Sequence, residues 1–242
     1  MVAPSLLLLA DARFPTGGHA HSAGTEQAVA IGDVRDVESL DRYLRARLAT
    51  TGRTDAAFTA FTCRMGSDPN RHLIDAEGRR PVGWGLTPSD LAATDREYSA
   101  RMPSPYLRDA SRRLGRQLVR VASRTWPSAA LAEVAATPGG PHQPIALGAA
   151  AASAGARPVD AAVLALHHLA GAVATAGVRL LGLDPIEVAA VQAEATETAA
   201  ATALVDEPWL VDDPAHLPAS GGLLTEILGE HHGSLDARLF VA

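Results

Sequence analysis

The sequence contains no lysine, so arginine supplies all 21 of its basic residues. A P-loop nucleotide site needs a lysine, and that class of site is therefore excluded. Cys63 is the only cysteine, which excludes an internal disulfide and a zinc site built from cysteines. Aromatic residues make up only 4%, and no run of alternating β-branched residues predicts a strand. These absences favour a helical protein without a recognisable nucleotide site.

Hydrophobic residues, with alanine the most abundant, make up 47% of the 242 residues. Because alanine is the best helix former, we predict one all-α domain over residues 1–242, a bundle of about eight to ten helices. The net charge of -6 argues against nucleic acid or an anionic membrane as a partner. The start lacks the basic region of a signal peptide, so we expect a cytoplasmic protein. The uncharged stretch Ala161–Val178 is long enough to resemble a membrane span, but we expect a buried helix.

Residues that commonly cap helices recur along the chain and predict where helices begin. They stand at Ser22, Asp36, Thr87, Ser104 and Ser128. Glu26 would lie in the first turn of the first of these helices, and Gly52 is expected to end the second. Further helices are predicted over Asp55–Met65, Ile145–Ala156, Val159–Leu181 and Pro185–Leu204.

The segment from Arg13 to Glu26, RFPTGGHAHSAGTE, is rich in glycine and histidine. It lacks the spacing of a dinucleotide fingerprint, so we do not interpret it as a phosphate cradle. His19 and His21 lie two residues apart and could face one metal ion, but two ligands do not make a site. We interpret the segment as a structural turn that leads into a helix. The alternative is a small metal-dependent hydrolase that uses His19, His21 and Glu26, and a tight metal site on the isolated chain would favour it.

Two basic features predict contacts with a partner. A helix carries six arginines over Arg108–Arg124, which face either an acidic partner or the acids of neighbouring helices. Residues 235–242 form the second feature, a C-terminal tail in which an arginine precedes two apolar residues. Arg238 would make a bidentate contact, and Leu239 and Phe240 would fill an apolar pocket of the partner. We expect this tail to be mobile until the partner binds.

Several motifs in the same order resemble the urease accessory protein UreF family over almost the full length. The opening matches the family pattern at Asp11, Phe14, Pro15, Gly17, His21, Ser22, Gly24 and Glu26. The segment Ser111–Ala122, SRRLGRQLVRVA, is similar to the central Arg-Gly-Arg helix of the family. His142, Pro144 and Gly148 match its H-x-P-x-x-x-G segment.

This resemblance implies a scaffold or chaperone without catalytic residues, resident metal ligands or a cofactor. It implies binding to a UreD/UreH-type accessory protein, recruitment of a UreG-type GTPase, and delivery of nickel to apo-urease. The implied structural turn or nickel route would involve Pro15, Gly17, His21, Ser22 and Glu26. The implied GTPase-facing or structural residues are Arg113, Arg116 and His142. The family forms homodimers, and we expect the small-residue helices Ile145–Ala156 and Val159–Leu181 to form the dimer interface.

Overall fold

The computed structural model describes residues 4–16, 21–67, 87–203, 205, 207–233 and 239–240, and in this part of the chain it is all-α without strands. Its helices are α1 (Pro4–Ala10), α2 (Thr25–Ala30), α3 (Val37–Arg47), α4 (Arg53–Gly66), α5 (Pro88–Ala100), α6 (Pro105–Thr125), α7 (Ala129–Ala135), α8 (Gln143–Ser153), α9 (Pro158–Leu181), α10 (Pro185–Ala203) and α11 (Leu223–Gly233). A short 3-10 helix covers Pro214–His216. Because α3 continues into α4, the described residues form ten separate α-helical runs. The predicted all-α bundle is confirmed.

The predicted helix starts are confirmed at four of the five capping residues. Asp36 accepts a hydrogen bond from the Ser39 N–H at 2.8 Å, and Ser39 returns the contact in a capping box. Thr87 forms the same reciprocal arrangement ahead of α5. Ser104 and Ser128 each accept, at 3.1 Å, the N–H three residues further on. These caps satisfy backbone donors that a helix leaves open at its start.

Two predicted boundaries are wrong. The cap of α2 is Gly24, in the left-handed conformation with φ 81°. Ser22 is buried, and its hydroxyl has no hydrogen-bond partner among the described residues. Glycine is required at this position, because a Cβ there would lie 2.9 Å from the Tyr43 hydroxyl. Gly52 does not end the helix that Asp36 starts. A π-helical turn over Leu48–Gly52 carries the chain from α3 into α4 instead.

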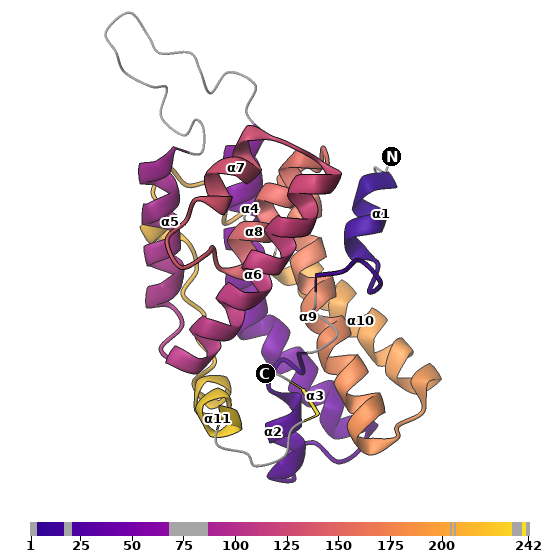
Figure 1. The fold of residues 1–242 in the computed structure, drawn as a ribbon. Helices are drawn as coiled ribbons and strands as arrows, with labels where there is room; N and C mark the ends of the chain where they lie inside the picture. Colours follow the sequence, from indigo (N-terminus) through magenta and orange to yellow (C-terminus); the bar gives the residue numbers. More distant parts are fainter. Residues whose placement is uncertain are drawn as a thin grey trace, which may run out of the picture.

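The core is centred on α8, which packs along α4 and α6 and also contacts α9 (Figure 1). Eight of the eleven residues of α8 are buried, and none of its residues is charged. At Gly148 the helices are so close that a Cβ would lie 2.4 Å from the Thr59 carbonyl oxygen. The expectation that Ile145–Ala156 forms a dimer interface is therefore wrong, since this helix is already covered by the chain's own fold.

The outer helices surround this core. α10 lies on the outer side of α9, and α1 packs against α9 near the opposite end from α2 (Figure 1). α9 is the one described helix long and apolar enough to cross a membrane by length and composition. However, 61% of its most apolar stretch is buried inside the fold, as in the core helix of a soluble protein. α11 packs on α6 and α2 at the lower end in Figure 1.

Candidate functional site

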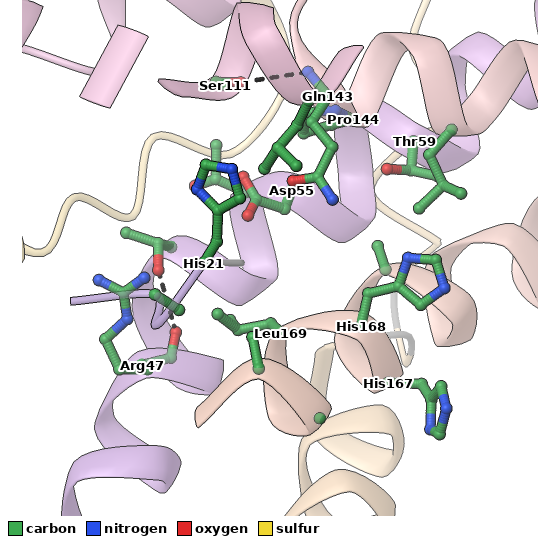
Figure 2. A pocket seen from close by; sticks show the side chains of 18 of the residues that line it. His21, Arg47, Asp55, Thr59, Ser111, Gln143, Pro144, His167, His168 and Leu169 are labelled. Atoms are coloured by element: carbon green, nitrogen blue, oxygen red, sulfur yellow. Dashed lines mark hydrogen bonds between the residues drawn. The ribbon is translucent and has the colours of Figure 1, made fainter. Parts of the chain in front are cut away.

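A cavity of about 560 Å³ lies where the opening segment meets α4, α5, α6, α8, α9 and the C-terminal part of the chain. Its polar lining includes His21, Arg47, Asp55, Tyr98, Arg101, Ser111, Gln143, His168 and Glu226. Figure 2 shows His21, Arg47 and Asp55 on one side of this cavity, and His167 and His168 on the other. The cavity therefore joins charged side chains that are far apart in the sequence.

Two carboxyl groups line the cavity, with Glu226 buried and Asp55 partly exposed. Asp55 accepts a hydrogen bond from the Tyr98 hydroxyl at 2.6 Å, but burial outweighs this contact and raises the pKa of Asp55 to about 6. The same burial raises the pKa of the Tyr98 hydroxyl well above its ordinary value. Burial also raises the pKa of Glu226, although its Oε2 accepts the Ser104 N–H at 2.7 Å. These groups hold their protons more tightly than exposed acids do.

Two arginines line the same cavity and differ in the hydrogen bonds that they make. Arg101 pairs with Glu97 at 2.7 Å and donates to backbone carbonyls near residues 214–218, including that of Leu217 at 2.9 Å. It therefore ties α5 to the segment before α11. Arg47, in the last turn of α3, is only 8% exposed, and its Nε and one terminal nitrogen contact no acceptor among the described residues.

The histidines do not form a metal centre within the described part of the chain, where no group of three His, Cys, Asp or Glu side chains is placed to hold an ion. His168 donates to the Leu9 carbonyl at 2.8 Å and so links α9 to α1. Burial lowers the pKa of His168 to about 4, which keeps the ring neutral. The hydrolase alternative needs His19, His21 and Glu26 together. His21 lines the cavity, Glu26 holds the C-terminal tail, and His19 lies outside the described residues.

The opening segment is anchored by contacts that support the predicted structural turn. Asp11 pairs with Arg13 at 2.6 Å, and this contact lowers the pKa of Asp11 to about 2. Phe14 is buried and stacks at a tilt on Trp126, with 5.6 Å between ring centroids. The Pro15 carbonyl accepts a hydrogen bond from the Gln117 side chain at 3.1 Å. Gly17, a candidate residue of the turn, lies outside the described residues.

The prediction that Phe240 of the C-terminal tail fills a pocket of a partner is wrong for this structure. Phe240 is only 3% exposed, and the Arg179 guanidinium lies 5.4 Å from its ring centroid. The carboxylate of Glu26 accepts the Leu239 N–H at 2.6 Å and the Phe240 N–H at 3.1 Å. Phe240 is therefore packed in the chain's own fold and is not available to a partner in this state. Leu239 is 57% exposed and remains a candidate contact, whereas Arg238 lies outside the described residues.

The remaining candidates lie around the loop before α8. His142 is fully buried between Ser99 and Ser111, with ring nitrogens 2.9 and 3.1 Å from their hydroxyls. Burial lowers its pKa to about 4, so the histidine is a neutral structural link. Arg116 donates to the Gly139 carbonyl at 2.6 Å and holds the same loop. Arg113 is exposed on α6 and is the better candidate for facing a partner.

Sequence reasoning missed Arg47, Asp55, Tyr98 and Glu226. A pattern in the sequence could have found Arg47, because it follows Leu40 and Leu44 at helical spacing and so lies on the apolar face of α3. A charged residue on such a face is unusual and indicates either a buried ion pair or a binding site. Glu226 offered no comparable pattern, since it lies in a short helix after a turn-rich stretch.

Comparison with known proteins identifies the chain's relatives. A family model described as UreF matches residues 34–196. A protein from Mycobacterium sp. (strain JLS) named urease accessory protein UreF is 37% identical over 241 residues, 98% of each chain. The proteins of the same name from Mycobacterium marinum and Mycobacterium tuberculosis (strain ATCC 25177 / H37Ra) are 34% and 32% identical, over 98% of this chain and 97% of theirs. The chain belongs to the UreF family of urease accessory proteins.

Proposed function

We propose that the chain is a cytoplasmic scaffold that binds a UreD/UreH-type partner, recruits a UreG-type GTPase, and helps the assembly insert nickel into apo-urease. The observation that carries this proposal is the similarity to UreF proteins along 98% of this chain and 97–98% of theirs. It covers the opening segment and the C-terminal part as well as the core. The proposed role involves no turnover by the isolated chain, which we expect to hydrolyse neither GTP nor urea.

Exposed apolar residues support a partner-binding surface at the C-terminal end. Leu223, Leu224 and Ile227 of α11 are exposed, as is Leu239. α11 packs against α2, and Leu239 is held by Glu26 of α2, so both elements belong to one end of the molecule. We assign this α11 surface, together with Leu239, to the UreD/UreH-type partner, since exposed apolar groups of this kind mark protein contacts. We assign the exposed Arg113 face of α6 to the GTPase.

The cavity supports a role as part of a nickel route. Its Asp55 and Glu226 carboxyls are groups that attract a divalent cation. In this proposal the metal is cargo and passes from one weak contact to the next. We expect Asp55→Asn to lower the nickel content of urease while the complex still assembles. An unchanged nickel content in that variant would exclude Asp55 from the route.

The proposed homodimer needs a surface other than α8. α9 presents Val163 outward, and the neighbouring α1 exposes Leu7 and Leu8. We propose that the dimer forms through these residues. Light scattering should show a dimer for the unmodified chain and a monomer for Leu7→Asp combined with Val163→Asp. A chain that is monomeric at micromolar concentration would contradict the proposal.

Co-purification tests the function as a whole. The tagged chain is co-expressed with the UreD, UreG and urease proteins of one organism, and bound proteins and urease nickel are measured. We expect Leu224→Asp with Ile227→Asp to abolish capture of the UreD-type partner. Ile186→Asp on α10 is the matched control, because Ile186 is 80% exposed on an outer helix. Equal capture by both variants would contradict the assignment of the α11 surface.

A further inference from the structure

Four exposed arginines of α6 form a single line of positive charge, the α6 arginine row. Its members are Arg113, Arg116, Arg120 and Arg124. Their spacing of three, four and four residues places them on one side of the helix, over about 17 Å of its length. The opposite side of α6 is buried against α7 and α8. The row is therefore presented by a helix that is fixed on the core.

The α6 arginine row lacks acidic partners in the described part of its own chain. None of its four side chains lies within 4.0 Å of a carboxylate there. Exposed arginines elsewhere do have such partners: Arg13 lies 2.6 Å from Asp11. Arg42 likewise lies 3.1 Å from Glu38, one turn away on α3. Because like charges three or four positions apart destabilise a helix, a bound group of opposite charge would relieve this repulsion.

One member of the row is already ordered in the free chain. Arg116 donates from Nη1 to the Gly139 carbonyl at 2.6 Å. Its stem lies so close to Gly140 that a Cβ added there would collide with it. The side chains of the other three arginines make no hydrogen bond to the described residues, so their donors are open to a partner. A cation that is fixed before binding loses less conformational entropy when the partner arrives.

The composition of α6 restricts the kind of partner. The helix exposes no large apolar side chain, so its outer face has nothing to insert into a membrane. A nucleic acid backbone would continue beyond the short row and meet the remainder of a chain whose net charge is -6. Carboxylates match the paired N–H donors of a guanidinium. A helix with acids at three- and four-residue spacing repeats its carboxylates with the same rise as the row.

We infer that the α6 arginine row is a docking surface for an acidic helix of a protein partner, whose carboxylates lie along the four guanidinium groups. The inference rests on the proposed function for the identity of that partner, because the exposed Arg113 face of α6 is assigned there to the UreG-type GTPase. The row adds the chemistry of the contact, a line of charge-assisted hydrogen bonds along one helix face. Since these contacts remain close to solvent, binding should weaken as the salt concentration rises.

Fluorescence anisotropy of the isolated full chain with two labelled peptides tests the surface directly. Both peptides are alanine-rich, about twenty residues long and of equal composition, a length at which such sequences form helices. The first carries its glutamates on one face at three- and four-residue spacing, and the second carries them on all sides. We expect the first peptide to bind more tightly than the second, and its affinity to fall as sodium chloride is added.

Charge reversal identifies the arginines that bind the peptide. Arg113→Glu with Arg120→Glu should weaken binding of the first peptide by at least about tenfold. Arg35→Glu with Arg53→Glu is the matched control, since it makes the same change of charge at exposed arginines outside α6 and should alter binding by less than about twofold. If circular dichroism shows that the reversed variant does not fold, Arg113→Gln with Arg120→Gln replaces it, with an expected loss of at least about threefold.

The same variants are then compared for capture of the UreG-type GTPase in the co-expressed complex. Loss of capture with Arg113→Glu and Arg120→Glu, but not with the control, would support the inference. Row-dependent peptide binding with unchanged capture would keep the inference and show that the GTPase is wrongly assigned to this face. Equal binding of both peptides, binding that does not respond to salt, or equal weakening by the control variant would overturn the inference. Tighter row-dependent binding of poly-uridine RNA than of the first peptide would overturn the choice of a protein partner.

Discussion

Helices α8 and α10 are both rich in alanine, yet they occupy opposite environments. Eight of the eleven residues of α8 are buried, whereas only Val188, Ala195 and Ala203 are buried in the nineteen-residue α10. α8 has no charged residue, and α10 carries Glu187, Glu194 and Glu197. Alanine thus sets the helical conformation of both segments, while the charged residues decide which helix is covered. In a chain with so few aromatic residues, the core depends on close backbone packing rather than on large side chains.

The largest expected effect compares one isoleucine in each helix. Ile145 of α8 is 0% exposed and Ile186 of α10 is 80% exposed. Ile145→Ala should lower the free energy of unfolding by about 4 kcal/mol, because it removes buried methyl groups and leaves a cavity. Ile186→Ala should change it by less than about 0.5 kcal/mol. Urea denaturation of the two variants measures both values, and similar losses would show that α10 is covered in solution.

The next largest expected effect is the change in stability when a glycine within a helix is replaced by alanine, compared at two positions. A Cβ at Gly148 would meet the Thr59 carbonyl oxygen at 2.4 Å, whereas at Gly171 of α9 the nearest atom lies at 3.6 Å. We expect Gly148→Ala to destabilise the fold by about 3 kcal/mol, because backbone atoms must move apart. Gly171→Ala should instead stabilise it by about 0.5–1 kcal/mol through helix propensity. Thermal unfolding of both variants is the measurement, and a neutral Gly148→Ala would contradict the close packing of α8 on α4.

A pH-dependent effect concerns His142, the residue before α8. Burial lowers its pKa from 6.5 to about 4, so the unfolded chain takes up a proton near pH 6.5 and the folded chain does not. The stabilisation is complete above pH 6.5 and is lost as the pH falls toward 4. The difference in unfolding free energy between the unmodified chain and His142→Gln should therefore shrink by about 2–3 kcal/mol over this range. The raised pKa of Asp55 changes stability in the opposite direction over this pH range, but Asp55 is present in both proteins and its effect cancels in the comparison. A difference in unfolding free energy that does not change with pH would contradict the prediction.

The smallest expected effect is on the local stability of the C-terminal tail. Glu26→Gln leaves one acceptor oxygen for the two N–H groups of Leu239 and Phe240 that its carboxylate now binds. We expect the local stability of the tail to fall by about 1–2 kcal/mol, with little change elsewhere. Amide hydrogen exchange at these two residues measures this loss. Glu38→Gln, which alters an exposed pair on α3, serves as the control and should leave the exchange unchanged.

Local chemistry made much of the fold predictable from the sequence. The caps at Asp36, Thr87, Ser104 and Ser128 define helix starts because they act on the next few residues. The prediction that Gly52 ends a helix was wrong, since packing against Leu166 and Leu169 keeps this glycine within a continuous helix. The choice of α8 as an interface was also wrong. Small residues predict that a helix packs closely, but they do not tell whether its neighbour is the same chain or another.

The cavity was much less predictable than the helices. His21 was singled out, but Arg47 and Asp55 lie on the continuous run of α3 and α4, and Glu226 of α11 meets them only in the tertiary structure. The role of Glu26 was also hidden, because its partners are backbone groups more than two hundred residues away. Sequence periodicity describes one element at a time, whereas both features depend on how several elements meet.

The π-helical turn between α3 and α4 sets the rotational phase of one helix against the other. In a regular α-helix, residues eight positions apart differ in direction by about 80° around the axis. A π-helical turn accommodates one extra residue and so removes about 100° of that rotation. Arg47 and Asp55 are eight positions apart and flank this turn, and they end within about 20° of each other. Deleting one residue within Leu48–Gly52 would restore a regular α-helix in which these two residues are seven positions apart and keep nearly the same relative direction. Forcing the full eight-residue spacing into a regular α-helix would instead turn them about 80° apart.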